Sequence, residues 1–270
     1  IKLHKGNVAL LGGVIFFVNI FIYILYQLIF LEDFLMLKNS FFNSRDIFII
    51  IFFILSFFLI GLFDDKFGIK PSLRLFLITL FSFVILLVEK DLIITKFSLS
   101  FYSNKIFLNE FSIFFTLFCI IILINALNFY DGINGQSGFF YLFVFSYLYF
   151  ICEQNYFYLF LILIIIFNLY LNLSNKLFFG DSGVYLITTI IIISLIYEHN
   201  ITKNIIYADQ IFLLLLMPGL DLVRLTLQRL ISFKNVFHGD RDHLHHLLNK
   251  RFNIINTNII LLILNFFPII

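Results

Sequence analysis

The chain has 270 residues, of which 61% are hydrophobic and only 13% are charged, and its mean hydropathy is +1.04. A soluble domain of this length would lack the polar surface it needs, so the composition excludes an ordinary globular protein and predicts one whose solvent is lipid. The formal net charge of +2 becomes informative only when the charges are assigned to the two faces of a membrane. We expect no nucleic-acid partner.

Apolar runs of roughly 20 residues, the length that crosses a bilayer, recur along the whole sequence. They predict about nine transmembrane helices, in chain order at residues 8–30, 46–63, 71–88, 110–127, 138–152, 156–173, 183–197, 209–228 and from 257 onward. Residues 91–109 alternate in polarity and are too polar to span, so we expect a short hairpin or an interfacial segment there.

These runs predict an all-α, polytopic integral membrane protein with a single transmembrane domain over residues 1–270. The chain opens on Ile1 and stops inside an apolar run. We therefore expect it to be truncated at both ends.

Four polar segments interrupt the apolar runs, and the alternation of the spans places all four on one face of the bilayer. They are Asp64–Asp65, Asn125–Gly135, Gly180–Gly183 and His238–His246. Twelve of the 18 Lys and Arg residues fall on the same face, which the positive-inside rule assigns to the cytoplasm. Every acid on this face is Asp, whereas every Glu lies opposite. Short carboxylates gathered at one boundary favour a metal and phosphates over solvation alone.

Two adjacent carboxylates such as Asp64 and Asp65 repel each other, and the pair is stable at neutral pH only in water or beside a cation. One interpretation is a solvated turn that caps the next helix. The other is a part in Mg²⁺ and proton handling, because Mg²⁺ commonly takes one or two carboxylates together with water and substrate phosphate.

The segment NALNFYDGING places Asn125, Asn128 and Asp131 at intervals of three residues. At a helix end this spacing sets the three side chains on one face, either as caps or as ligands. The glycines that follow would let the backbone approach a ligand closely.

The third and fourth polar segments each allow more than one interpretation. Asp181, in GDSG, is either the N-cap of the next span or a neighbour of helix amides that receive a phosphate oxygen. The segment HGDRDHLHH could bind zinc, touch anionic lipid, or supply cations and donors to a diphosphate. Upstream, Pro218–Gly219 is expected to bend its helix, which either shapes a groove for a lipid tail or is only a kink.

Five ordered motifs resemble those of the polyprenyl-phosphate N-acetylhexosamine-1-phosphate transferase family, whose bacterial members begin O-antigen, teichoic acid and peptidoglycan lipid intermediates. The resemblance covers nearly the whole chain, and the last motif is closer to the surface-polysaccharide enzymes than to the peptidoglycan branch. The motifs are HKGNVALLGG (4–13), GLFDDKFG (61–68), NALNFYDGING (125–135), FFGDSG (178–183), and PGLD (218–221) followed by HGDRDHLHHLL (238–248).

The resemblance implies transfer of a sugar-1-phosphate from a UDP-sugar, with an N-acetylhexosamine expected, to undecaprenyl phosphate, with release of UMP. It implies Mg²⁺ as cofactor, with Mn²⁺ as a substitute, and a multi-pass protein of the bacterial cytoplasmic (inner) membrane. The active site would face the cytoplasm and begin a cell-surface polysaccharide, and a homodimer is compatible with this arrangement.

The same resemblance assigns roles to residues. Asn128 and Asp181 would bind Mg²⁺, and Asp131 would help to place metal or nucleotide. Asp64 and Asp65 would orient or deprotonate the lipid phosphate, with a purely electrostatic role open for Asp64. The expected catalytic set is Asp64, Asp65, Asp131 and Asp181, and the expected substrate-binding set is Lys5, Asn125, Arg241, His243, His245 and His246.

The sequence departs from the family pattern at three places. Prolines are missing around Asn7 and Ala9, Asn134 stands where many relatives have Asp, and the helix before the first motif is absent. The alternatives are a phospho-MurNAc-pentapeptide transferase and a membrane transporter. Most span interiors carry no Asp, Glu, Lys or Arg, which disfavours transport.

Overall fold

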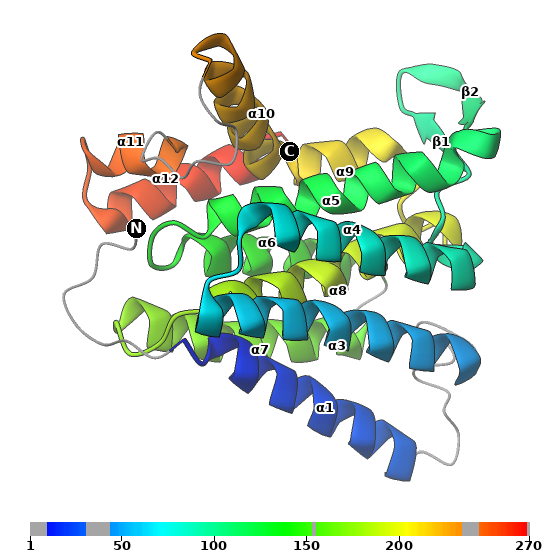
Figure 1. The fold of residues 1–270 in the computed structure, drawn as a ribbon, viewed down its shortest axis with the longest axis horizontal. Coiled ribbons are helices and arrows are strands. Elements are labelled where there is room, and N and C mark those ends of the chain that lie inside the picture. The colour runs from blue at the N-terminus through cyan, green and yellow to red at the C-terminus, as the bar shows by residue number, and fades with distance from the viewer. Residues whose placement is uncertain (1–9, 31–43, 153–154, 234–242, 269–270) are drawn as a thin grey trace.

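The computed structural model describes residues 10–30, 44–152, 155–233 and 243–268, and it is built almost entirely of helices (Figure 1). The long helices run along one common direction and form a bundle with two ends. The helices are α1 (Gly12–Phe30), α3 (Ser44–Phe67), α4 (Pro71–Val88), α5 (Ser112–Tyr130), α6 (Gln136–Ile151), α7 (Tyr156–Leu173), α8 (Gly180–Asn200), α9 (Ala208–Leu214), α10 (Leu216–Ile231), α11 (Leu244–Asn249) and α12 (Ile254–Phe266).

The predicted all-helical membrane architecture is confirmed, whereas the number of nine spans stays a prediction. Within the described residues, five helices are long and apolar enough to cross a bilayer, and a sixth span results if α9 and α10 are counted together. The five are Phe48–Phe67, Pro71–Val88, Asn109–Tyr130, Tyr156–Leu173 and Gly180–Asn200. The apolar segments Gly12–Tyr26, Gln136–Ile151 and Ile254–Phe266 coincide with the other three expected spans but are shorter.

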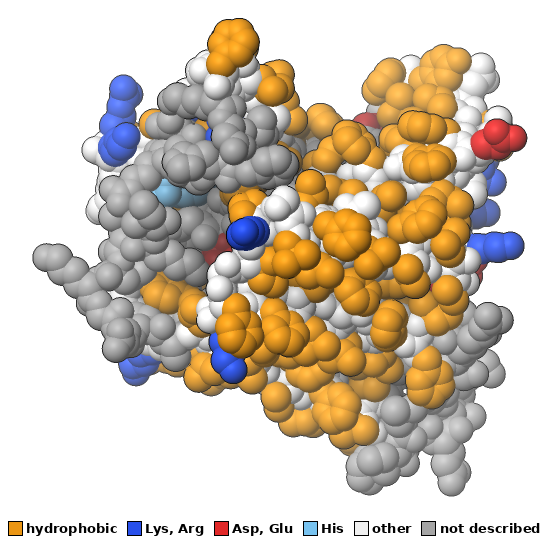
Figure 2. Space-filling view, in the orientation of Figure 1, with side chains coloured by type: hydrophobic (Ala, Val, Ile, Leu, Met, Phe, Trp, Pro, Cys, Tyr) orange, Lys and Arg blue, Asp and Glu red, His pale blue; other side chains and the backbone are white. Residues whose placement is uncertain are grey.

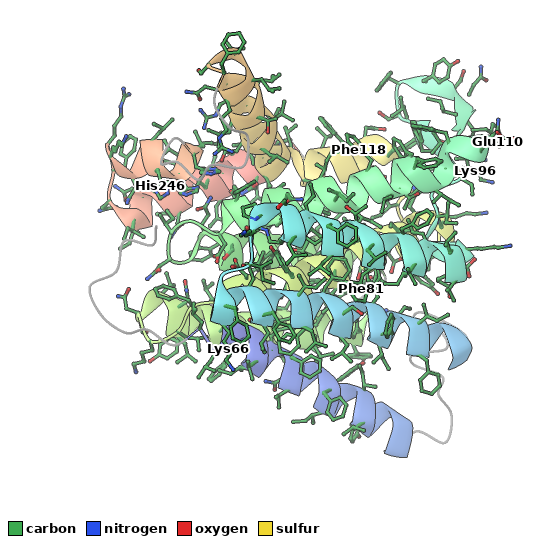
Figure 3. The ribbon with its side chains drawn as sticks, in the orientation of Figure 1. Lys66, Phe81, Lys96, Glu110, Phe118 and His246 are labelled. Carbon is green, nitrogen blue, oxygen red and sulfur yellow. The ribbon has the colours of Figure 1, made fainter. Side chains whose placement is uncertain are left out.

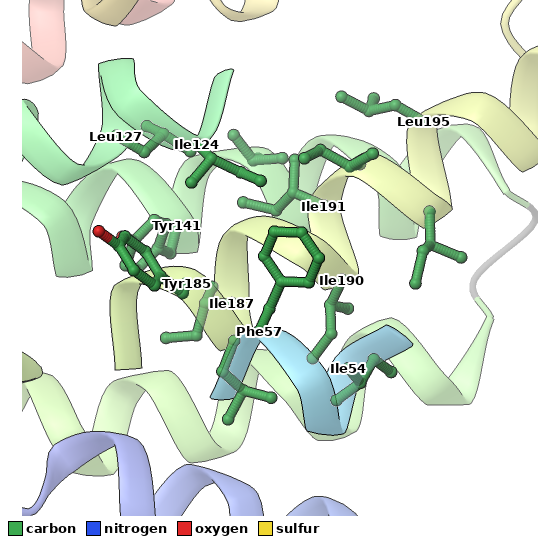
Figure 4. Packing of buried hydrophobic residues seen from close by; sticks show 14 of the residues in the cluster. Ile54, Phe57, Ile124, Leu127, Tyr141, Tyr185, Ile187, Ile190, Ile191 and Leu195 are labelled. Carbon is green, nitrogen blue, oxygen red and sulfur yellow. The ribbon is translucent and has the colours of Figure 1, made fainter. Parts of the chain in front are cut away.

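Helix α8 is the centre of the bundle, with 94% of its apolar window buried inside the protein. It packs against α3, α1 and α5. Figure 4 shows Ile187, Ile190 and Ile191 of α8 among side chains that include Phe57 of α3. Because lipid tails are as apolar as these side chains, close van der Waals packing rather than escape from water holds such helices together. A buried central helix therefore fixes the positions of whatever its two ends carry.

The outer surface of the bundle is apolar in its middle and charged at its ends. Figure 2 shows a broad area of hydrophobic side chains, with Lys and Arg side chains in the left half of the view and at its right edge. Phe76 on α4, Phe118 on α5 and Phe167 on α7 each expose more than half of their surface. Such exposure would be costly in water and is expected where the neighbour is lipid.

The segment predicted as either a hairpin or an interfacial stretch forms a hairpin. Strands β1 (Lys96–Leu99) and β2 (Tyr102–Phe107) pair antiparallel, with Lys96 opposite Phe107 and Leu99 opposite Tyr102. Single turns of 3-10 helix flank it, η1 (Lys90–Leu92) and η2 (Asn109–Phe111). The hairpin lies at the end of the bundle where α4 and α8 finish.

The expected bend near Pro218 is present but lies three residues upstream. Helices α9 and α10 meet at Leu215 with an angle of 73°. Pro218 itself is in the first turn of α10, where its missing N–H is tolerated. Its ring excludes the carbonyl group four residues earlier, at Leu214, so a continuous helix has to break before the proline rather than at it.

Candidate active site

The carboxylate of Asp65 holds the N-terminus of α8. Its Oδ1 accepts the backbone N–H of Asp181 at 2.8 Å, and its Oδ2 accepts the backbone N–H of Ser182 at 3.0 Å and its hydroxyl at 2.7 Å. Gly180 adopts a φ of +69°, and a Cβ there would lie 2.6 Å from Asp65 Oδ2. Only glycine lets the chain turn into α8 this close to the carboxylate.

This geometry supports neither of the two interpretations of GDSG. Asp181 lies inside the first turn of α8 and is not its N-cap. The amides that could have received a phosphate oxygen are occupied by Asp65 instead. A carboxylate from α3 therefore caps α8 across the fold. The positive end of the helix dipole of α8 also stabilises the negative charge of this carboxylate.

Asn128, near the end of α5, reaches the same point of α8. Its Nδ2 donates to Asp181 Oδ1 at 2.9 Å. Asn125, one turn earlier, donates instead to the carbonyl of Ile121 in its own helix at 2.7 Å. Asp131 terminates α5 and accepts the hydroxyl of Ser137 at 2.5 Å. The predicted metal-binding pair is thus brought together, while the amide of Asn125 is engaged by its own helix.

Asp64 is buried and paired with a cation. Its Oδ2 lies 3.2 Å from Arg74 Nη1, and its Oδ1 accepts the backbone N–H of Ile69 at 2.9 Å. Arg74 is in the first turn of α4 and is mostly buried. The repulsion between Asp64 and Asp65 is therefore relieved by dividing the pair, with Asp64 facing α4 and Asp65 facing α8.

A cluster of asparagines fixes the loop between α5 and α6. Asn134 Nδ2 donates to the backbone oxygen of Asn172 at 3.3 Å and to Asn175 Oδ1 at 2.6 Å. The backbone oxygen of Asn134 accepts a hydrogen bond from Asn258 Nδ2 at 2.8 Å. A carboxylate at position 134 could not donate to these oxygens. The departure from the family pattern at this position therefore has a structural reason in this chain.

The described end of the histidine segment (His238–His246), from His243 onward, packs over this loop. His245 is 1% exposed, and a Cβ built on Gly132 would lie 1.8 Å from its Nε2, so only glycine leaves room for the ring. Its Nδ1 lies 3.4 Å from Gln136 Nε2 at the start of α6. Burial, then the charges of His246 and His243, lower the pKa of His245 from its ordinary 6.5 to about 3. The ring is therefore neutral at pH 7.

His243 is oriented by Asp221 of α10. Its Nδ1 lies 3.0 Å from Asp221 Oδ2, and its ring is 5.5 Å from that of Phe129. Asp221 Oδ1 also accepts the backbone N–H of Leu244 at 3.0 Å and Arg224 Nη2 at 2.9 Å. The PGLD motif thus anchors the histidine segment.

Asp221, His243 and His245 also form a buried group whose ligand atoms lie within 4.8 Å of one another. A mixed nitrogen and oxygen set of this kind suits zinc or another transition metal rather than Mg²⁺. The zinc alternative thus has a candidate ligand set, although two of its ligand atoms already make the hydrogen bond between His243 and Asp221.

The described parts of the four polar segments meet at one end of the bundle: Asp65 and Asn128 both contact the first turn of α8 at Asp181, and the ring of His243 contacts that of Phe129. Figure 3 shows Lys66 and His246 at this end of the bundle and Lys96 at the other. His246 packs its ring 4.2 Å from that of His245. Lys5 and Arg241 lie outside the described residues.

Three further residues belong to this site, although the sequence analysis did not select them. Arg74 neutralises Asp64, Gln136 faces His245, and Arg229 is buried with its guanidinium 6.0 Å from the ring centre of Phe129. A cation in the first or last turn of an apolar run was the available signal for both arginines. Gln136 carried no signal beyond its place at a helix start.

Comparison with known proteins places this geometry in context. A family model described as glycosyl transferase family 4 matches residues 47–199, which include the first three polar segments but not the fourth, His238–His246. The chain is 28% identical over 202 residues to the undecaprenyl-phosphate alpha-N-acetylglucosaminyl 1-phosphate transferases of Escherichia coli O157:H7 and Shigella flexneri, and 27% identical to that of Yersinia pestis. These alignments cover 71% of this chain and 55% of each relative, so the chain spans about half the length of the curated relatives it matches.

Proposed function

Because the chain belongs to glycosyl transferase family 4, we propose that it transfers a sugar-1-phosphate from a UDP-sugar to undecaprenyl phosphate. In this reaction an oxygen of the lipid phosphate attacks the β-phosphorus of the donor. A new phosphorus–oxygen bond joins lipid and sugar phosphates, and the bond to the α-phosphate breaks, so that UMP leaves with the electron pair. The sugar is an N-acetylhexosamine, and N-acetylglucosamine is the first to test because the matched relatives are named for it.

We place the reaction at the end of the bundle that carries Asp65, Asn128 and Asp181, on the cytoplasmic side of a bacterial inner membrane. The supporting observation is the contact between Asn128 and Asp181, whose helices α5 and α8 are far apart in sequence. The charge bias of the sequence supports the orientation. The position of the site also suits a lipid acceptor. The site lies where the apolar helices end, so the phosphate of the lipid can reach it while the lipid tail stays in the bilayer.

The donor atoms at this point fit Mg²⁺. A carboxylate on Asp181 and an amide oxygen on Asn128 are hard oxygen ligands, and Mg²⁺ takes few protein ligands of this type and completes its shell with water and phosphate. When bound, the ion would neutralise charge on the diphosphate oxygens during the transfer. Mn²⁺ is expected to substitute, because it accepts the same ligands.

The other residues act on position and charge. Asp65 fixes the first turn of α8, and therefore fixes Asp181 against Asn128. Arg74 balances the charge of Asp64, which leaves Asp64 an electrostatic and orienting part beside the lipid phosphate. In the histidine segment, neutral His245 supports the loop at Gly132, while His243 and His246 would donate to the diphosphate or the sugar.

Release of UMP from the full chain in washed membranes tests the proposal. The reaction contains UDP-N-acetylglucosamine, undecaprenyl phosphate and Mg²⁺, and each is omitted in turn. We expect release to require all three, and we expect Asp181→Asn to reduce it by about 100-fold, the scale found when one group that stabilises transition-state charge is removed. A panel of other UDP-sugars then identifies the donor.

Glu110→Gln is the matched control, because Glu110 is an exposed carboxylate at the other end of the bundle. It should keep the wild-type rate. The proposal fails if no UDP-sugar yields UMP, or if Asp181→Asn retains near wild-type release.

A further inference from the structure

A cavity of about 480 Å³ lies at the hairpin end of the bundle, far from the candidate active site. Its walls come from η1 and the hairpin on one side and from the end of α8 and the following loop on the other. Figure 3 shows Lys96 at this end and His246 at the opposite end. The cavity therefore lies at the opposite end of the bundle from the site proposed for sugar transfer.

The cavity is positively charged. Four lysines line it, Lys90, Lys96, Lys105 and Lys203, against a single lining acid, Asp91. All four are exposed, and within the described part of the chain none has a carboxylate oxygen within 4.0 Å. Four ammonium groups around one concave surface repel each other unless an anion lies between them.

Hydrogen bonds fix the two walls relative to each other. Asn200 Nδ2 donates to the backbone oxygens of Asp91 and Ile93 at 2.8 and 3.0 Å. The ring nitrogens of His199 lie 3.0 Å from the oxygen of Ile205 and 3.3 Å from that of Lys96. The backbone positions of the lysines are therefore set by the fold, and the cavity is present without a ligand to organise it.

Apolar side chains form part of the rim of the cavity. Ile201 and Ile206 line it and are 44% and 58% exposed, while Phe101 and Phe107, on the hairpin but outside the lining, are 80% and 62% exposed. Exposed apolar side chains are expected where the neighbour is lipid. An occupant that suits both the lysines and this rim carries a phosphate on an apolar tail.

We propose that this cavity binds the phosphate group of an anionic lipid in the leaflet at the hairpin end. The bound group is the phosphate of a lipid that carries a net negative charge, and not a free anion from solution. This site is independent of the proposed transferase activity, since it uses other residues at the other end of the bundle.

Native mass spectrometry of the full chain in detergent tests the proposal, with phosphatidylglycerol as the anionic probe and phosphatidylcholine as the zwitterionic one. We expect phosphatidylglycerol to remain bound in preference to phosphatidylcholine. The variant Lys96→Gln/Lys105→Gln/Lys203→Gln should weaken phosphatidylglycerol binding at least about tenfold, since each lysine near an anionic lipid surface contributes to the attraction. Replacing the same three lysines by Arg should retain binding.

The matched control removes three exposed charges elsewhere, in Lys176→Gln/Lys250→Gln/Arg251→Gln, and should leave this affinity unchanged. Millimolar inorganic pyrophosphate provides the second arm. The proposal is overturned if phosphatidylglycerol and phosphatidylcholine bind alike, or if both triple variants weaken binding equally. Binding of pyrophosphate without phosphatidylglycerol would also overturn it, because the ligand would then be a free anion.

Discussion

The two ends of α8 each hold a carboxylate that accepts three hydrogen bonds, yet the two carboxylates differ in what surrounds them. At the N-terminus Asp65 accepts from the backbone of Asp181 and from Ser182. At the C-terminus Glu198, which is 1% exposed, accepts from the hydroxyl of Tyr158, the hydroxyl of Thr202 and the amide of Asn204. A carboxylate thus ties each end of the central helix to its neighbours, Asp65 from α3 at one end and Glu198 of α8 itself at the other.

The difference lies in the neighbouring groups. Beside Asp65 stand Asn128 and Asp181, which offer oxygen ligands at the proposed reaction centre. Beside Glu198 stand the loop and the hairpin that carry the lysines of the cavity. A buried, satisfied carboxylate is therefore not by itself a sign of catalysis, and its role follows from what it holds in place.

The strongest test of this comparison replaces each carboxylate by its amide. Asp65→Asn loses the charge and leaves one acceptor oxygen for three donors, so the first turn of α8 loosens beside Asp181. We expect UMP release to fall by about 100-fold, equivalent to about 2.7 kcal/mol of transition-state stabilisation. Unfolding in detergent should show a loss of about 1–3 kcal/mol.

The matched variant is Glu198→Gln. We expect a similar loss in the free energy of unfolding, because three donors again share one remaining acceptor oxygen. Release of UMP per folded molecule should stay within about threefold of wild type, since a factor of three corresponds to only about 0.65 kcal/mol. Equal losses of activity in the two variants would contradict the division between the ends of α8.

A second comparison separates two glycines of the active-site end. In Gly132→Ala the new methyl group would meet the ring of His245, whereas a Cβ on Gly219 in α10 has no neighbour within 4 Å. Gly132→Ala should therefore lose about 1–3 kcal/mol through overpacking and lower UMP release, because the loop that follows Asp131 has to move. Gly219→Ala should be neutral or slightly stabilising, as Ala favours a helix interior. Thermal unfolding and UMP release measure both, and equal behaviour would show that His245 does not pack as described.

The pair formed by Asp221 and His243 provides a smaller test. If Asp221 acts by orienting His243, Asp221→Ala and His243→Ala should each reduce UMP release by about tenfold, equivalent to about 1.4 kcal/mol. The double variant should then lose no more than either single variant, because the same interaction is removed twice. Rates that multiply in the double variant would instead indicate independent roles.

The architecture and the clustering of the polar segments could be predicted from the sequence because both depend on periodicity. Runs of apolar residues set the helices, and counting those runs placed Asp65, Asn128 and Asp181 on one face. The alternation over residues 91–109 was too polar to cross the membrane and left a hairpin or an interfacial segment as alternatives, of which the hairpin at 96–107 is present.

The pairing of individual groups could not be predicted, because it depends on where helices far apart in sequence meet. Nothing in the local pattern around Asp65 indicates that it caps α8, since its partners are 116 and 117 residues away. The pairing of Asp64 with Arg74 and the fit of His245 over Gly132 are of the same kind. Residue type and spacing gave the members of the site, whereas tertiary packing decides which of them bind ligands and which hold others in place.

The last prediction concerns pH and His245, which is buried at the active-site end of the bundle. In the folded protein its pKa is about 3, against 6.5 in the unfolded chain. Between these values the unfolded state binds more protons, so the free energy of unfolding falls as the pH falls, by at most about 1.4 kcal/mol per pH unit.

Above pH 6.5 both states are neutral at this residue and its contribution is constant. His245→Asn keeps an acceptor for Gln136 but does not titrate. The stability of the wild type relative to this variant should therefore shrink steadily as the pH is lowered from 7 to 4, measured as the difference between their thermal unfolding midpoints in detergent. A difference that does not change with pH would mean that water reaches the ring, and that the histidine segment does not close over Gly132 in solution.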